Sequence, residues 1–227
     1  MKHLSFLLLI FVSCTHKDAG QTPLAEKEPV VTELHLNYDS CKKVIGVIKK
    51  LSRESWKTLS KEKKEDIFTN AVTKTIIPCW IGTSWSFNGI SQQPGEGSIA
   101  CGYFVTTVLR DAGLDLARVK LAQCASEQMI LSLIQPKYVQ RFSNVPITDF
   151  IATVKQAGTG LYIVGLDDHT GFIHYDGMHV YFIHSSVAGT RNVQHELASM
   201  SSVLQNSKYK VLGKLSADEK VLDRWIQ

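Results

Sequence analysis

Apolar side chains recur at helical spacing between residues 44 and 75, and again from about residue 98 to residue 157. The first two sets are Val44, Val47, Ile48 and Leu51, and then Ile67, Phe68, Ala71, Val72 and Thr75. Three further helices are expected over 98–112, 126–134 and 146–157, with Ser98 as the N-cap of the first. Glycines at 113 and 158 are the expected stops of the first and third. The charged segment 52–66 is expected to be solvated surface or the start of a helix.

Beyond residue 160 the pattern changes to that of β-strands. An apolar run over 161–166 is followed by segments 171–175 and 178–184, which flank an Asp-Gly pair and predict a hairpin. A last strand is expected over 211–215, and Ser216 with Glu219 forms a capping-box pattern that opens a final helix. Helices first and a mostly antiparallel sheet afterwards predict an α+β fold.

The hairpin brings four histidines into register. If the Asp-Gly pair is a two-residue turn, His169 lies opposite His184, and His174 lies opposite His179. Because strand side chains alternate between faces, the two pairs project from opposite sides of the sheet. Gly171 shares the face of His169 and leaves room beside it. The pair His174 and His179 is expected at the surface, and a turn longer by one residue would shift the register.

The first 30 residues follow neither pattern. Residues 4–12 form an apolar stretch that is too short to span a bilayer and, after a positively charged start, is typical of a secretory leader. The residues Phe-Val-Ser-Cys at 11–14 resemble a bacterial lipobox, in which Cys14 is lipidated after cleavage; simple cleavage is the alternative. We expect a signal peptide over 1–13, a lipidated flexible tether over 14–30 and a single domain over 31–227. The protein would be exported and lipid-anchored, facing the periplasm or the cell surface.

Composition narrows the class of protein. The chain has 227 residues, 44% hydrophobic and 20% charged, and a mean hydropathy of −0.03, which excludes a mainly disordered chain and a multi-span membrane protein. The formal net charge of +4 is spread along the chain, so no basic tract for nucleic acid stands out. The five cysteines and eight histidines therefore carry the candidate chemistry.

One cysteine is placed for catalysis. Cys101 falls in the first turn of a predicted helix, where the helix dipole favours a thiolate, and it follows a flexible Pro-Gly-Glu-Gly loop. His169 on a strand can act as its base and His184 can orient that base, which is the minimum apparatus for acyl transfer. The alternatives are a buried structural cysteine, or a zinc site formed by the same three residues.

Four segments in this order resemble the NlpC/P60 family of papain-like cysteine peptidases. They are Gly-Thr-Ser-Trp-Ser-Phe-Asn-Gly at 82–89, Ile-Ala-Cys-Gly-Tyr-Phe-Val at 99–105, His-Thr-Gly-Phe-Ile at 169–173 and Phe-Ile-His-Ser-Ser at 182–186. The resemblance covers residues 80 to 186 and implies a papain-like core over 79–227, preceded by a helical part over 30–78. Departures are Ala100 in place of the usual Asp, Gly102-Tyr103 in place of Ser-Gly, and a longer separation of the two histidines.

The resemblance implies a catalytic domain with Cys101 as nucleophile, His169 as general base and His184 as the orienting third residue. Trp85 stands where the family has an aromatic residue that lines the site. Together with Tyr103, Gln93 and Asp168, it is expected to contact substrate. An aspartate at 167 or 168 is the alternative orienting group.

The expected function is hydrolysis of an amide bond in peptidoglycan stem peptides, as an endopeptidase or amidase. No cofactor, no metal and no nucleic acid is expected, and the protein is expected to be a monomer whose partners are cell-wall peptides and the membrane that holds its lipid anchor. The alternatives are a non-catalytic wall- or peptide-binding module, and a cysteine-dependent amidase or acyltransferase that acts on protein. The remaining cysteines, Cys41, Cys79 and Cys124, allow one disulfide and a spare thiol, or three buried thiols.

Overall fold

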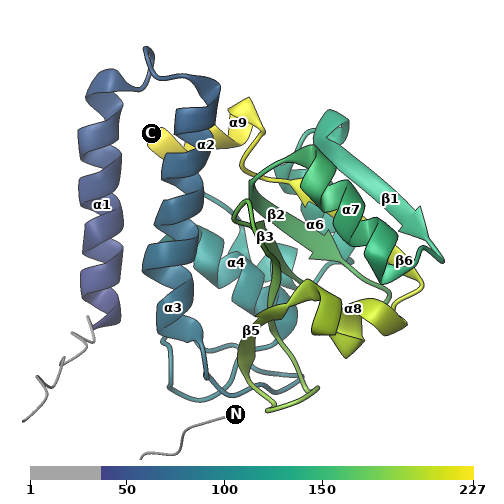
Figure 1. Ribbon diagram of the computed structural model, residues 1–227. Helices are drawn as coiled ribbons and strands as arrows, with labels where there is room; N and C mark the ends of the chain where they lie inside the picture. The colour runs from purple at the N-terminus through teal and green to yellow at the C-terminus, as the bar shows by residue number, and fades with distance from the viewer. Residues whose placement is uncertain (1–36) are drawn as a thin grey trace, which may run out of the picture. The chain divides into compact units, whose positions relative to one another are not determined.

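The structure is a computed structural model that describes residues 37–227 (Figure 1). The predicted signal peptide, the predicted lipidation site at Cys14 and the predicted tether lie outside the described residues. Over residues 37–227, no helix combines the length and the apolar character needed to cross a membrane.

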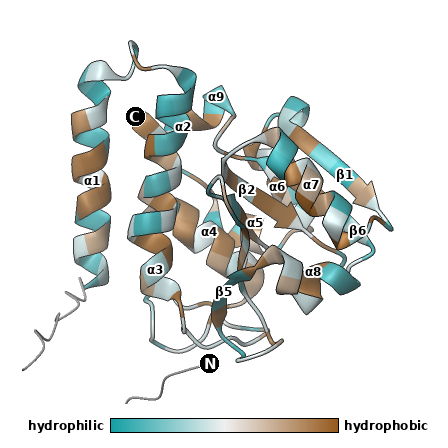
Figure 2. Ribbon diagram, in the orientation of Figure 1, coloured by the Kyte–Doolittle hydropathy of each residue, from teal (hydrophilic) through white to brown (hydrophobic). Residues whose placement is uncertain are grey.

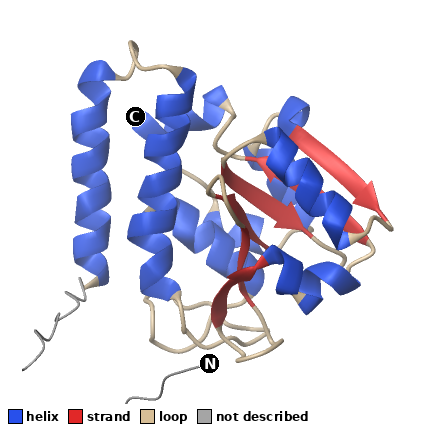
Figure 3. Cartoon of the chain, viewed as in Figure 1, coloured by secondary structure: helices blue, strands red, loops and turns tan. Residues whose placement is uncertain are grey.

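The described chain begins with helices, and most of its strands follow in the C-terminal half (Figures 1 and 3). The α-helices are α1 (Tyr38–Ser55), α2 (Lys61–Asn70), α3 (Ile77–Trp80), α4 (Cys101–Asp111), α5 (Arg118–Ala122), α6 (Ser126–Leu133), α7 (Ile147–Ala157), α8 (Ser202–Asn206) and α9 (Glu219–Ile226). A π-helix, η1 (Ala71–Ile76), joins α2 to α3, and two 3₁₀ turns are η2 (Pro136–Tyr138) and η3 (Ala198–Met200). The strands are β1 (Val139–Ser143), β2 (Gly160–Gly165), β3 (Thr170–Tyr175), β4 (Val180–Ser185), β5 (Val193–Leu197) and β6 (Tyr209–Lys214).

The six strands form one sheet in the order β1-β6-β2-β3-β4-β5, and every neighbouring pair is antiparallel. The prediction of an α+β fold with an antiparallel sheet is therefore confirmed. The sequence pattern did not predict β1 and β5, which are the two edge strands, or the short helices α5 and α8. Both strands are short and carry only two apolar residues each, so their apolar alternation is weak.

Helices cover both faces of the sheet, and each face has its own core. On one face Phe172 packs edge-to-face against Phe104 of α4, with 5.8 Å between the ring centroids. This core also contains the buried residues of α1, η1 and α9. On the other face Tyr162 and Phe182 pack with Phe150 of α7. The N-terminal helices thus share a core with the sheet, and Figure 2 shows the apolar residues along α4 and β2.

Helix α1 forms where expected, but its buried face differs from the apolar set that predicted it. Asn37 caps the helix, because its side chain accepts a hydrogen bond from the Asp39 backbone N–H at 2.7 Å. The buried residues are Tyr38, Cys41 and Ile45. Three members of the predicting set are exposed instead: Val44 at 37%, Val47 at 55% and Leu51 at 69%.

The hairpin turn is longer than predicted. Tyr175 pairs with Val180, so the turn contains four residues, 176–179, and the predicted two-residue turn is wrong. Asp176 closes the turn by accepting hydrogen bonds from the backbone N–H groups of Met178 and His179 at 2.8 and 2.7 Å. The register therefore shifts by two residues, which keeps every side chain on its predicted face.

The shift changes the histidine pairs. His174 lies opposite Tyr181 rather than His179, and the observed register no longer places His169 directly opposite His184. His179 is exposed in the turn, as expected, whereas His174 is buried, so its predicted surface position is wrong. Its side chain stacks on Tyr181 on the sheet face that carries Phe172.

Two predicted helix caps are also wrong. Asp218, not Ser216, caps α9 and accepts a hydrogen bond from the Lys220 backbone N–H at 2.9 Å. The Ser216 hydroxyl instead accepts from the Leu161 N–H on β2 at 3.2 Å. Helix α4 begins at Cys101, and Ala100 rather than Ser98 is at the N-cap position. The Ser98 hydroxyl instead forms a hydrogen bond with the hydroxyl of Ser86 at 2.7 Å. Both predicted stops hold, with glycines of positive φ at 113 and 158.

Candidate functional site

Cys101 is the first residue of α4, and no side chain caps this end of the helix. The first N–H groups of a helix have no acceptor within it, so they remain available to a neighbouring group. The backbone N–H groups of Thr170, Gly102 and Cys101 face the sulfur and lower the pKa of the thiol. Burial outweighs them and raises the pKa of Cys101 above its ordinary 9.0. The residue is therefore a neutral thiol near pH 7.

The residue after the cysteine has to be glycine. A side chain at Gly102 would place its Cβ 2.4 Å from the carbonyl oxygen of Ala122, at the end of α5. Helix α4 thus approaches α5 so closely that the serine found in the NlpC/P60 pattern does not fit. This departure from the pattern therefore has a packing cause.

The two predicted partner histidines meet. His169, directly before β3, and His184, on β4, join ring nitrogens Nε2 and Nδ1 at 2.9 Å. Gly171 makes this possible, since a Cβ there would lie 2.8 Å from the Cβ of His184. This contact confirms the expectation that His169, Gly171 and His184 share one face of the sheet. The two histidines are diagonal neighbours, however, and do not lie directly opposite one another.

A glutamate that the sequence reading missed extends this chain of contacts. The other ring nitrogen of His184, Nε2, lies 3.1 Å from Oε1 of Glu196 on β5. Glu196 pairs with Phe182 in the sheet and so shares the face of His184. Glu196 could have been placed beside His184 from the sequence only if the strand over 193–197 had been predicted.

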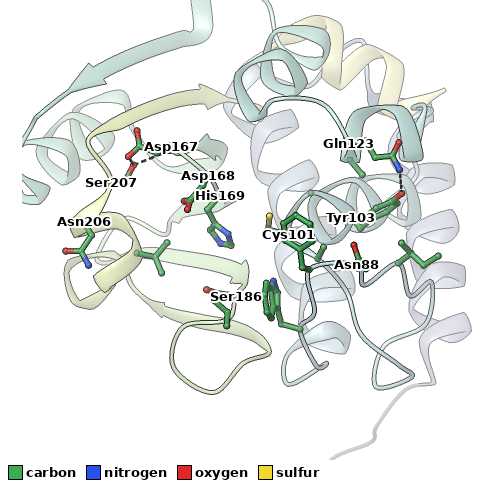
Figure 4. Close-up of a pocket in the computed structure, with 18 residues that line it drawn as sticks. Asn88, Cys101, Tyr103, Gln123, Asp167, Asp168, His169, Ser186, Asn206 and Ser207 are labelled. Carbon is green, nitrogen blue, oxygen red and sulfur yellow. Dashed lines mark hydrogen bonds between the residues drawn. The ribbon is translucent and has the colours of Figure 1, made fainter.

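The glutamate determines where the protons sit. A carboxylate only accepts hydrogen bonds, so His184 Nε2 carries a proton toward Glu196. His184 Nδ1 is then an acceptor, and it accepts a hydrogen bond from the N–H at Nε2 of His169. As a result Nδ1 of His169 keeps its lone pair and is the nitrogen left to act as a base. Figure 4 shows His169 and the Cys101 sulfur pointing toward one another across the cavity.

Both histidines stay neutral. Burial, together with the neighbouring His184, lowers the pKa of His169 to about 3, although Asp168 opposes the shift. Burial alone lowers the pKa of His184 to about 3. The ring of His184 also stacks on Phe182, with 3.9 Å between the centroids, which fixes its plane. The site in this state is a neutral thiol beside a neutral, oriented imidazole.

A cavity of about 990 Å³ opens over Cys101 and His169 (Figure 4). Its lining comes from the segments 85–90, 100–103, 122–123, 167–169, 186–187 and 203–207. A second hollow of about 430 Å³ adjoins it and shares six lining residues, including both Cys101 and His169. The thiol therefore lies where the two hollows meet.

Aromatic side chains line the larger hollow. Trp85 is fixed by its backbone N–H, which donates to the Arg191 carbonyl at 2.9 Å, and the Arg191 guanidinium lies 5.7 Å from its ring. The Tyr103 hydroxyl accepts a hydrogen bond from Gln123 at 3.0 Å (Figure 4). Phe87, which the sequence reading did not single out, is 83% exposed in the same lining.

Of the other residues predicted for the site, some line the hollows and one does not. Asp168 is exposed and lines both hollows. Asp167 is held by the Ser207 hydroxyl and by the backbone N–H groups of Lys208 and Tyr209, so it fixes the loop before His169. Gln93 lines neither hollow, and its backbone is bound to the hydroxyl of Ser91.

Among residues 37–227, no group of three or more histidine, cysteine or acidic side chains is arranged to hold a metal ion. No protein-family model, no curated protein and no solved structure matches this chain.

Proposed function

We propose that this protein is a cysteine hydrolase that cleaves an amide bond through Cys101. The observation that carries the proposal is the chain of contacts Glu196–His184–His169, which ends at the His169 ring across the cavity from the Cys101 sulfur. A buried structural cysteine has no need of an oriented base or of an open cavity above it. A nucleophile, in contrast, requires a base that is neutral and held in one orientation, which the two neutral histidines and the Glu196 carboxylate provide.

A papain-like fold of the NlpC/P60 type is part of the proposal. In its support, a helix that begins with the cysteine packs on an antiparallel sheet, and successive elements of that sheet carry the two histidines. Each of the four segments that carry the sequence resemblance also contributes residues to the lining of the cavity.

The proposed reaction proceeds in two steps. As the Cys101 sulfur attacks the amide carbonyl carbon, its proton passes to Nδ1 of His169. The backbone N–H of Cys101, at the start of α4, stabilises the negative oxygen that forms. The C–N bond then breaks as His169 returns the proton to the leaving amine, and a thioester remains on Cys101.

Water completes the cycle. His169 takes a proton from a water molecule as its oxygen attacks the thioester carbon, and the C–S bond breaks. The sulfur recovers its proton from His169, and the acid product leaves. Glu196 and His184 stay in place through both steps and hold His169 in the tautomer that accepts a proton at Nδ1.

The proposed substrates are the stem peptides of peptidoglycan, cut within the peptide or at its link to the sugar. This choice rests on the resemblance and on the lipobox-like leader, which would place the enzyme outside the cytoplasm beside that polymer. The two adjoining hollows suit an extended peptide, and exposed Asp168 offers a negative charge to the free amino groups that such peptides carry.

The test is digestion of purified muropeptides by the full chain, with products identified by mass. We expect a product that gains one water across an amide bond, and its loss in Cys101→Ala and in His169→Gln. His179→Gln is the matched control, because His179 is exposed in the hairpin turn, and it should retain full activity. A product that forms equally with Cys101→Ala, or no product from wild type, overturns the proposal.

A non-catalytic peptide-binding module is the second candidate, because burial raises the pKa of the Cys101 thiol and so opposes thiolate formation. It predicts that muropeptides bind wild type and Cys101→Ala equally and are recovered intact. Iodoacetamide labelling separates the two: we expect the hydrolase to show Cys101 alkylation that depends on His169, and a binder to show none.

A further inference from the structure

Two cysteines outside the cavity lie in contact. Cys41 on α1 and Cys79 on α3 are 38 residues apart in sequence, yet their sulfur atoms are 2.9 Å apart. Cys41 is 4% exposed, and Cys79 also donates to the carbonyl of Thr75 at 3.4 Å. A disulfide has a sulfur–sulfur bond of about 2.05 Å, so the two atoms have less than an ångström to close.

We propose that Cys41 and Cys79 form a disulfide that joins helix α1 to helix α3. This inference does not depend on the hydrolase activity, because neither residue lines the cavity over Cys101. It requires an oxidant of the disulfide class, such as a thiol-disulfide oxidoreductase of an oxidising compartment or glutathione disulfide. One protein thiolate attacks the oxidant and releases one thiol from it. The second protein thiolate then displaces the other half of the oxidant as a second thiol, so two protein thiols lose two protons and two electrons.

The other cysteines are placed differently. Cys124 donates to the carbonyl of Leu121 at 3.2 Å and lies beside the smaller hollow, and Cys101 faces His169. Of the three pairings that Cys41, Cys79 and Cys124 allow, the geometry thus selects one. The sequence alone left all three open.

The position of the bond indicates a structural role. Burial, followed by the hydrogen bond with Cys41, raises the pKa of Cys79 to about 12, so Cys79 is almost entirely a neutral thiol near pH 7, and Cys41 is only 4% exposed to an attacking reagent. Thiol exchange needs a thiolate, and oxidation of the folded, reduced chain should therefore be slow. Once formed, the buried bond is equally hard for a reductant to reach.

The crosslink would also support the wall of the cavity. Directly after Cys79, the Trp80 indole donates to the Tyr38 hydroxyl at 2.8 Å, and that hydroxyl donates to Asp111 at the end of α4 at 2.7 Å. The segment that follows α3 carries Trp85 into the cavity. A covalent bond between α1 and α3 holds the start of this segment against α4.

The test uses the full chain with Cys101→Ala, reduced, unfolded and refolded in glutathione redox buffer, then alkylated and digested with trypsin without reduction. In this variant the tryptic peptides 28–42, 75–110 and 121–137 each carry one cysteine, at positions 41, 79 and 124. Cys14 falls in a fourth peptide, 3–17. We expect peptide 28–42 linked to 75–110, and peptide 121–137 alkylated. Recovery of 28–42 and 75–110 as alkylated peptides, or linkage of either to 121–137, overturns the proposal.

Thermal unfolding gives the second measurement. Closing a loop of this length restricts the unfolded chain, so Cys101→Ala protein that is reduced while unfolded and refolded in reductant should have a Tm roughly 5–10 °C below that of protein refolded in the glutathione redox buffer. Adding Cys124→Ala should leave this shift unchanged, whereas adding Cys41→Ala should abolish it. A Tm that does not respond to reduction contradicts the proposal.

Discussion

Glu196 determines which ring nitrogen of each histidine carries a proton. Its carboxylate accepts from His184, His184 accepts from His169, and His169 is left with a free lone pair at Nδ1. The glutamate lies two contacts away from the thiol, so it is a positioning residue. Its effect reaches Cys101 only through the tautomers of the two imidazole rings.

Replacing the glutamate with its amide tests this chain. In Glu196→Gln the side-chain NH₂ can donate to His184 Nε2, which reverses both tautomers and puts a proton on Nδ1 of His169. We expect kcat to fall on the order of 10²-fold or more, by analogy with the loss that a wrong tautomer causes in serine hydrolases. The control is His195→Gln, one residue away on the other face of β5, which should keep its activity. Equal rates for the two variants would remove Glu196 from the mechanism.

The pH profile of the reaction tests the charge state of the pair. Catalysis needs a neutral His169, whose pKa is lowered to about 3, and burial raises the pKa of the Cys101 thiol above 9.0. We therefore expect kcat/KM to be flat between about pH 4 and pH 8, as measured on a muropeptide substrate. An acidic limb near pH 6.5 would instead indicate a thiolate–imidazolium pair.

At the scale of elements, the hairpin β3–β4 and the helix α4 bring the site together. The hairpin aligns His169 with His184, and the start of α4 supplies the thiol. Each alignment depends on a glycine that allows close approach, Gly171 between the strands and Gly102 between α4 and α5. The four-residue turn at 176–179 preserves this alignment, because a shift by two residues leaves each side chain on its face.

The close approach at Gly171 predicts a sensitive position. In Gly171→Ala the new Cβ would lie 2.7 Å from the Phe182 ring and 2.8 Å from His184, so β3 and β4 must separate. We expect roughly 1–3 kcal/mol of destabilisation in urea unfolding, together with loss of activity. Gly46→Ala on α1 is the matched control, since nothing lies within 4 Å of its Cβ, and it should be as stable as wild type or up to about 1 kcal/mol more stable. A Gly171→Ala protein with wild-type stability and activity would show that the strands do not need this contact.

For the molecule as a whole, buried histidines link stability to pH. The pKa values of His169 and His184 are lowered to about 3, and that of His174, on the opposite face of the sheet, to about 4, in each case mainly by burial. A histidine whose folded-state pKa is lowered binds its proton more weakly than it does in the unfolded chain. Acid therefore favours unfolding below the unfolded pKa of about 6.5.

We expect the free energy of unfolding to fall as the pH is lowered from 6.5 to 5, by up to about 1.4 kcal/mol per pH unit for each buried histidine. Above pH 6.5 these residues are neutral in both states and add no slope. Urea unfolding at a series of pH values measures the effect. His174→Gln, which lies outside the cavity over Cys101, should reduce the slope by the equivalent of one proton. An unchanged slope in this variant would mean that His174 is not held neutral in the folded protein.

Much of the architecture could be predicted from local pattern. Helices α1, α4, α6 and α7, the hairpin and β6 follow from periodicity and from glycine stops, because these depend on neighbours close in sequence. The edge strands β1 and β5 were not predicted, because their apolar and polar residues do not alternate strongly. Glu196 was missed together with β5, which carries it. The predicted caps at Ser98 and Ser216 were wrong because these hydroxyls form hydrogen bonds with residues distant in sequence or in another element.

The sequence by itself determined the α+β class, the cysteine at a helix start, and the shared face of His169 and His184, since strand alternation survives a two-residue shift of register. Only the tertiary structure decided that the histidines meet diagonally through the space at Gly171, and that Glu196 orders their protons. Only it placed Cys41 against Cys79. The reason is that these contacts join elements far apart along the chain, and their distances are set by the packing of helices and strands, which no local pattern encodes.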